Sequence, residues 1–373
     1  MLTKTTLSLA VLLLVMTGAS AVQGQIIYGQ PTAGNLRVVY NSWTLDDNGA
    51  ETTISQFMIP VTGFIPLEED FEMSFYAANS SNNLEAAGQD YKLSGLSDVR
   101  LQVNHSFNED HILLTAVVNL PTGKKELDFG EEWQVLQALS TNYLNFPMQR
   151  FGEGFGFSLL LGGATMLGEN TRGGAGVMYQ FVGSYKPYEG FGDYNPGDLF
   201  SVNAGLDIEK GRTVWSFDAI YTLYTTDKVN DLSSFKQTPQ LDVRLSAKNS
   251  GQKIALSGLL RYVLRGNNKT YNEDGIELEP LKLYGDEFTV AGALSWMFKP
   301  EWYLAPAAHI RTVAGNDLDF GNSTIIGFGA ALGKDLGESV KAEAGYKLYT
   351  GSADGGDIDL SGYQITFGLT ASM

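Results

Sequence analysis

The sequence contains no cysteine among its 373 residues. A chain without cysteine has no disulfides, no thiolate chemistry and no lipoprotein attachment through a cysteine. Histidine is nearly as scarce, with only His105, His111 and His309, and no nucleophile motif accompanies these three residues. We therefore expect no catalytic residue, no metal ligand and no cofactor.

Long apolar runs and an excess of basic residues are also missing. The longest uninterrupted apolar run is the N-terminal one, and a helix that crosses a bilayer needs about 20 residues. A mean hydropathy of -0.08 also argues against a bundle of membrane helices. The 25 basic residues stand against 42 acidic ones, a formal charge of -17. Nucleic acid is therefore not an expected partner, because its phosphates are neutralised by Lys and Arg.

The N-terminus carries the pattern of an export signal. Lys4 precedes an apolar stretch over 7–16, and Ala19-Ser20-Ala21 has the small residues of a cleavage site. We predict a signal peptide over 1–21, with Gly24 as a second choice for the cleavage position, and a polar leader over 22–34. An uncleaved anchor helix is the alternative interpretation.

The feature that is abundant is alternation of apolar and polar residues. Successive side chains of a strand point to opposite faces, so alternation predicts strands with one apolar and one polar face. The clearest unit is the hairpin 200–224, and similar units recur almost to the C-terminus. Behind a secretory signal, this pattern predicts an all-β fold, an antiparallel transmembrane β-barrel of about sixteen strands that occupies 35–373 as one domain. Fourteen strands is the alternative, if the first arm or a weaker strand is mispaired.

The predicted connections alternate in length, as they do in barrels of the bacterial outer membrane. With both termini in the periplasm, the short turns face the periplasm and the long loops face outward. The sequence predicts short turns at 209–212, 249–251, 299–301 and 333–338. It predicts long polar loops at 80–95, 121–155, 186–198, 225–238, 266–285, 314–322 and 351–360. Pro306 lies inside an expected strand and predicts a bulge there, because proline cannot donate to a strand ladder.

The polar strand faces are expected to line the lumen. One interpretation is that their charges pair and hydrate the interior, and the other is a channel whose charges orient solutes. The mixture of signs argues against a strongly ion-selective pore. The lumen-lining candidates are Arg37, Glu72, Arg100, Asp207, Asp218, Asp242, Arg244, Arg261, Arg265, Arg311, Lys341, Glu343 and Lys347.

The long connection 121–155 is too apolar for a freely solvated loop. A short helix is expected over 131–140, where apolar residues recur near a period of 3.6. We expect the loop to fold against the lumen wall or the rim, either as a gate or as a cap that only shields the mouth. The gating candidates are Trp133, Leu136, Leu139, Tyr143 and Phe146.

Two short segments suggest a family. Ser94-Gly95-Leu96-Ser97-Asp98-Val99-Arg100-Leu101 and Val118-Asn119-Leu120-Pro121-Thr122-Gly123 resemble paired motifs of outer-membrane transporters of the meta-pathway phenol-degradation type. That group is distantly related to fatty-acid transport barrels. The resemblance covers roughly 35–370 and implies a barrel for uptake of hydrophobic or aromatic small molecules. It transfers no binding residue, and Ser97 stands where the family usually has a second glycine.

The function expected from these patterns is a passive outer-membrane channel or transporter, not an enzyme. Its expected partners are outer-membrane lipid and a small solute, hydrophobic or aromatic solutes among them, and the sequence leaves the oligomeric state open. A structural or adhesive surface barrel with a filled lumen is the second interpretation. A barrel hydrolase is the third.

Overall fold

The computed structural model describes residues 32–108 and 111–373. The predicted signal peptide, most of the expected leader and residues 109–110 of an expected turn lie outside the described residues. The first strand, β1, begins at Ala33, two residues before the expected start of the barrel.

Sixteen strands close into an antiparallel barrel, which confirms the predicted fold class and excludes the alternative of fourteen. About 68% of the chain is strand. The barrel strands are β1 (Ala33–Asp47), β2 (Ala50–Pro66), β3 (Phe71–Ala86), β5 (Val99–Phe107), β6 (Ile112–Leu120), β7 (Gly156–Gly168), β8 (Thr171–Val182), β10 (Leu199–Lys210), β11 (Thr213–Tyr224), β14 (Gln240–Ser250), β15 (Ile254–Arg265), β17 (Glu287–Lys299), β18 (Trp302–Val313), β19 (Ser323–Asp335), β20 (Val340–Ala353) and β21 (Ile358–Ser372).

The ring is closed by the two ends of the chain. β1 pairs with β2 on one side and with β21 on the other, from Ala33 opposite Ser372 to Asp47 opposite Ile358. Every other barrel strand pairs with its neighbours in chain order, so the sheet has no free long edge. A closed ladder satisfies all backbone groups within the sheet, which membrane-spanning strands require.

The register places the apolar residues of neighbouring strands on the same outer face. Between β10 and β11, Leu206 stands opposite Phe217 and Val202 opposite Tyr221. These outward side chains are 40–46% exposed, whereas the alternate Ser201 is buried. An exposed apolar surface that runs around a whole barrel is characteristic of a lipid-facing wall.

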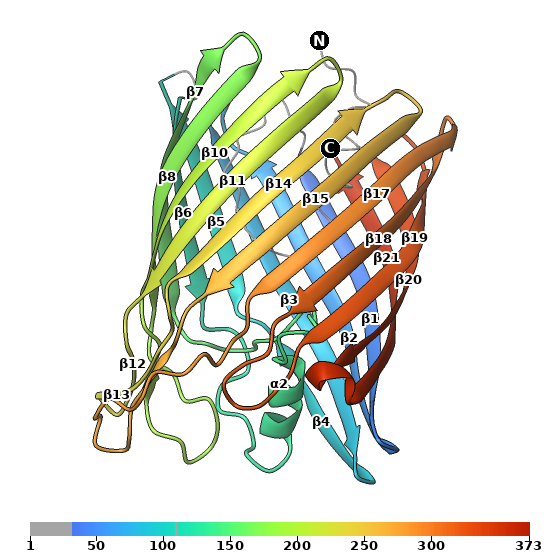
Figure 1. Ribbon diagram of the computed structural model, residues 1–373. Coiled ribbons are helices and arrows are strands. Elements are labelled where there is room, and N and C mark those ends of the chain that lie inside the picture. The colour runs from blue at the N-terminus through green and yellow to red at the C-terminus, as the bar shows by residue number, and fades with distance from the viewer. Residues whose placement is uncertain (1–31, 109–110) are drawn as a thin grey trace.

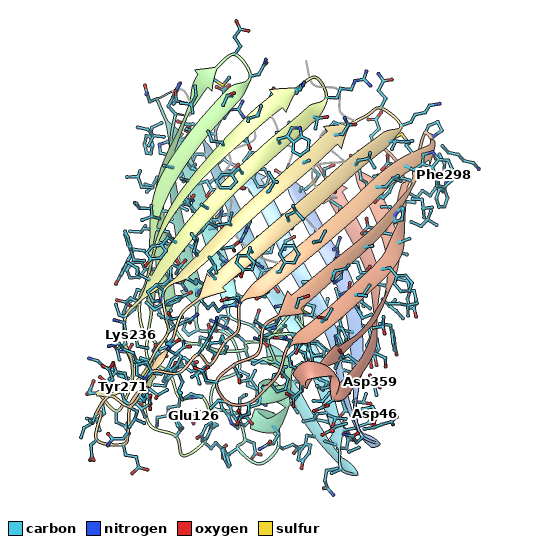
Figure 2. All side chains as sticks on the ribbon, viewed as in Figure 1. Asp46, Glu126, Lys236, Tyr271, Phe298 and Asp359 are labelled. Carbon is cyan, nitrogen blue, oxygen red and sulfur yellow. The ribbon has the colours of Figure 1, made fainter. Side chains whose placement is uncertain are left out.

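The two ends of the barrel differ as the alternating connections predict. One end, here called the turn end, joins strands by tight turns at 67–70, 169–170, 211–212, 251–253, 300–301 and 336–339. The other, the loop end, carries the long connections (Figure 1). Figure 2 shows Phe298 near the turn end and Glu126, Lys236 and Tyr271 at the loop end.

Two of the predicted long loops are wrong. The segment 80–95 is a hairpin, because β3 continues to Ala86 and β4 (Gln89–Leu96) pairs back onto it. Residues 80–83 are polar on both faces, so the apolar alternation that marks a strand is interrupted there. The segment 351–360 is mostly strand as well, since only η1 (Asp354–Gly356) and one further residue separate β20 from β21. The short connection between β1 and β2 also lies at the loop end.

A short helix and four short strands lie at the loop end. α2 (Glu132–Leu139) confirms the expected short helix in the long connection. A separate four-stranded sheet lies at this end. It consists of β9 (Tyr194–Asn195), β12 (Asp227–Val229), β13 (Leu232–Lys236) and β16 (Lys269–Thr270). Among the described residues, no helix has the length and apolarity needed to cross a membrane.

The predicted bulge at Pro306 is wrong. Pro306 pairs in register with Ala330 on β19. On its other side the ladder with β17 is interrupted for two residue pairs, yet Ala293–Ala307 and Trp296–Leu304 keep the same register. The proline removes local pairing without inserting a residue, and the bulge of this strand pair lies between Met297 and Lys299 instead.

Candidate functional site in the barrel lumen

A network of arginines and carboxylates runs along the inner face of β14, β15, β17 and β18. Asp242 accepts hydrogen bonds from Arg244 at 2.7 Å and from Arg261 at 2.8 Å. Glu287 pairs in the same way with Arg265 at 2.9 Å and with Arg311 at 2.7 Å. Each carboxylate is thus shared by two guanidinium groups, so the network has more positive than negative charge.

A second charged group lies on β1, β18 and β20. Arg37 and Glu343 approach to 3.5 Å, and the Tyr303 hydroxyl donates to the other oxygen of Glu343 at 2.9 Å. Lys347 lies four residues after Glu343 on the same inner face of β20 and forms no ion pair or hydrogen bond with the described residues. Lys341, at the turn end, lies 3.6 Å from Asp335.

The remaining lumen candidates are scattered over β3, β5, β10 and β11. Glu72 accepts a hydrogen bond from Asn104 at 2.6 Å. Asp207 and Asp218 lie close enough to repel each other, and neither has an ion pair within 4.0 Å among the described residues. Arg100 also has no carboxylate partner among the described residues. The structure therefore unites eight of the thirteen candidates in two charged groups and leaves the other five apart.

The long connection between β6 and β7 packs against the inner wall at the loop end of the barrel. We call residues 127–151 the plug segment. Leu139 and Val135 are fully buried, and Tyr143 is 8% exposed and Phe146 3%. Trp133 and Leu136 are partly buried against the same cluster. The burial agrees with the argument that this loop is too apolar for solvent.

The plug segment shares one apolar core with the inner wall. The wall contributes residues from β1, β2, β3, β4, β18, β19, β20 and β21, among them Trp43, Ile54 and Leu93. Tyr143 stacks on Phe320 with 5.6 Å between the ring centroids. Burial raises the pKa of the Tyr143 hydroxyl, with the nearby Asp354 adding to the effect. The segment is packed against the inner wall of the barrel mouth on the side formed by β1–β4 and β18–β21.

Polar anchors hold the plug segment at several points. Gln56, fully buried on β2, donates to the Met148 carbonyl at 2.7 Å and accepts from the Met148 amide at 3.1 Å. Arg311 on β18 donates to the Tyr143 carbonyl at 3.1 Å. The plug is therefore bonded to two strands that are not neighbours in the ring, and one anchor belongs to the arginine network.

Asp98 fastens the two ends of the same connection together. Its carboxylate oxygens accept from the backbone amides of Gly123 and Glu153, each at 2.8 Å. Lys124 forms an ion pair with Glu132 at the start of α2. Sequence reasoning missed Gln56 and Asp98 as anchors, because a single polar residue on an inner face has no periodic signal. The only available sign was that Asp98 lies within one of the family-like motifs.

A recess lies in the inner wall between β18 and β1. It is lined by Arg37, Ala307, Gly329, Glu343, Lys347 and Thr366, and its free volume for water-sized groups is about 40 Å³. The middle inner positions of β19 (Gly327, Gly329, Ala331 and Gly333) are glycine or alanine, so side chains of β18 and β20 lie across that part of the strand. Lys347 lies over Gly329, and the His309 ring lies over Gly327.

The three histidines contact aromatic rings or backbone carbonyls. His309 packs against Tyr349, with 5.9 Å between ring centroids. His105 packs against Phe71 and Phe107 and bonds to the Asp70 carbonyl. The His111 ring bonds to the Asn108 carbonyl.

No family model and no curated protein matches this chain. Several solved structures resemble it. A FadL homologue of Pseudomonas aeruginosa is 8% identical with a TM-score of 0.47, covering 92% of this chain and 90% of its own. OpdL of the same organism is 11% identical with a TM-score of 0.48, covering 92% and 99%. The CymD monoaromatic hydrocarbon channel is 12% identical with a TM-score of 0.44, covering 92% and 89%. The fold is defined by the strand pairing described above and not by these resemblances.

Proposed function

We propose that this protein is a passive channel of the bacterial outer membrane for small solutes, including hydrophobic and aromatic ones, and that the plug segment gates it. The observation that carries the proposal is the pairing of a charged inner wall with an apolar segment packed against that wall at one mouth. A barrel of 16 strands leaves an aqueous lumen unless loops fill it. The state of the lumen therefore depends on the plug segment.

The orientation follows from the connections. Tight turns at one end and long loops at the other are the arrangement of barrels whose turns face the periplasm. We place the loop end, with the plug segment, at the cell surface. The exposed apolar wall contacts membrane lipid, so the barrel takes lipid and a solute as its partners.

A solute would first meet the apolar core beneath the loops. Aromatic groups such as Trp133 and Tyr188, whose ring centroids are 4.8 Å apart, offer an apolar surface at the rim. Displacement of the plug segment would then open a path along the arginine network. Since Arg311 contacts both the plug and Glu287, movement of the plug exposes a charged donor to the lumen.

One alternative has a specific observation in its favour. The plug segment is anchored at Gln56, Asp98 and Arg311, and such anchors suit a permanent cap in a structural or adhesive surface barrel. The hydrolase interpretation has no such support, and we propose that the protein is not an enzyme.

Deletion of residues 127–149 separates the gate from the cap. A gate predicts higher single-channel conductance in planar bilayers and lost discrimination between hydrophobic and polar solutes. The deletion variant must first show a folded barrel by circular dichroism. Unchanged flux in a folded variant would leave only the cap. A matched control deletes 272–276 at the tip of another loop, which should leave conductance unchanged.

A further inference from the structure

The inner wall over β14–β20 and β1 is cationic, although the chain as a whole carries a formal charge of -17. The two charged groups of this wall contain six basic side chains and three acidic ones. The basic residues are Arg37, Arg244, Arg261, Arg265, Arg311 and Lys347, and the acidic ones are Asp242, Glu287 and Glu343. The chain's acidic excess therefore lies elsewhere.

Pairing does not remove this excess. Asp242 and Glu287 are each divided between two arginines, and Glu343 is divided between Arg37 and the Tyr303 hydroxyl. Lys347 has no carboxylate within 4.0 Å among the described residues. A mobile anion in the lumen would therefore complete the charge balance.

The recess beside Lys347 has the size and the donors for one small anionic group. A water needs about 10–15 Å³ of such volume, so about 40 Å³ holds roughly three water-sized groups. That is the size of a planar carboxylate, and a tetrahedral phosphate needs more room. Lys347, Arg37 and the Thr366 hydroxyl line the recess as donors, and the Glu343 carboxylate, which is bonded to Arg37 and Tyr303, lines it as well.

We propose that this cationic wall selects organic anions and that the recess beside Lys347 binds the carboxylate of the solute. The inference rests on the proposed channel and names the class of solute that the channel takes. An aromatic carboxylate fits both parts of the path, since its ring suits the apolar core at the mouth and its carboxylate suits the recess.

The test uses the full-length barrel in two independent assays. The first is the reversal potential in planar bilayers under a tenfold KCl gradient, together with liposome flux of benzoate, benzyl alcohol and benzylamine. We expect preference for chloride over potassium and faster flux of benzoate than of benzylamine. Lys347→Gln should reduce the benzoate preference about two- to fivefold, the range for one screened charge.

The second assay is calorimetric titration of the detergent-solubilised barrel with benzoate and with inorganic phosphate. We expect benzoate binding that is lost in Lys347→Gln and retained in Lys347→Arg, with weaker binding of phosphate. Lys92→Gln is the matched control, because Lys92 is an exposed lysine in the middle of β4, in the hairpin at the loop end.

The two assays distinguish the possible failures. A reversal potential that shows cation preference would overturn the inference, and so would benzoate binding that is unchanged in Lys347→Gln. Either result would leave the proposed channel intact. Stronger binding of phosphate than of benzoate would overturn the carboxylate assignment. Lys347-dependent benzoate binding without flux would sustain the site and remove the proposed channel. Absence of benzoate flux together with absence of benzoate binding would refute the proposed channel and the proposed carboxylate site.

Discussion

Gln56 shows how much of the arrangement depends on single polar residues. Its amide satisfies both backbone groups of Met148 in a fully buried position, and its side chain also donates to Asn82. A buried backbone group without a partner costs about 1–3 kcal/mol. The residue thus links a barrel strand to the plug segment through bonds that water cannot easily replace.

Gln56→Ala should therefore loosen the plug segment and leave the barrel closed. We expect a loss of about 2–4 kcal/mol in the local stability of the plug, because two buried groups lose their partner. Hydrogen exchange read by mass spectrometry should speed up over 140–151. Gln102→Ala is the control, since Gln102 on β5 donates to Asn104 and not to the plug. Equal exchange over 140–151 in the two variants would show that Gln56 is not an anchor.

At the scale of the element, each strand has one apolar face and one polar face, and this periodicity is why the strands could be predicted from sequence. The prediction failed where the alternation is absent. In the β3–β4 hairpin, Ser80 and Asn82 are buried on the inner side, where polar groups bond to each other and to the backbone. Over 80–83 the pattern is polar on both faces and resembles a loop. The anchors at Asp98 and Gln56 were missed for a related reason, since they depend on pairing between distant segments.

The two faces should differ in their sensitivity to charge. Leu206→Arg or Phe217→Arg should destabilise the folded barrel by about 2–4 kcal/mol if the position lies at the bilayer midplane. Asn203→Arg, on the inner face of the same strand as Leu206, should cost less because its charge enters the lumen. Unfolding titrations in lipid vesicles measure the difference. Equal losses on the two faces would contradict the assignment of the outer wall to lipid.

The whole molecule is a closed ring, and closure is the property that the sequence could support but not prove. Alternating segments and connection lengths predicted the strand number, whereas the pairing of the first strand with the last has no local signal. The same holds for the lumen, since the sequence predicted which residues face inward by alternation but not which carboxylate joins which arginine.

A closed ladder without edges should resist detergent. We expect the folded protein to remain sheet in cold SDS and to migrate differently before and after boiling, because no strand edge is open to dissociation. Gel mobility and far-UV circular dichroism check this. A predominantly helical spectrum, or identical mobility before and after heating, would be incompatible with the barrel.

The anchoring of the plug segment also constrains the order in which the molecule can be assembled. The segment lies between β6 and β7, and its Gln56 anchor comes earlier in the chain, so both can meet while the sheet is still growing. The Arg311 anchor belongs to β18, and the seam between β1 and β21 requires the last strand of all. If the ring closed first, the plug segment would have to enter through a mouth that strands already surround. We therefore expect the plug segment to pack against the growing sheet first, and the later strands to be added around it.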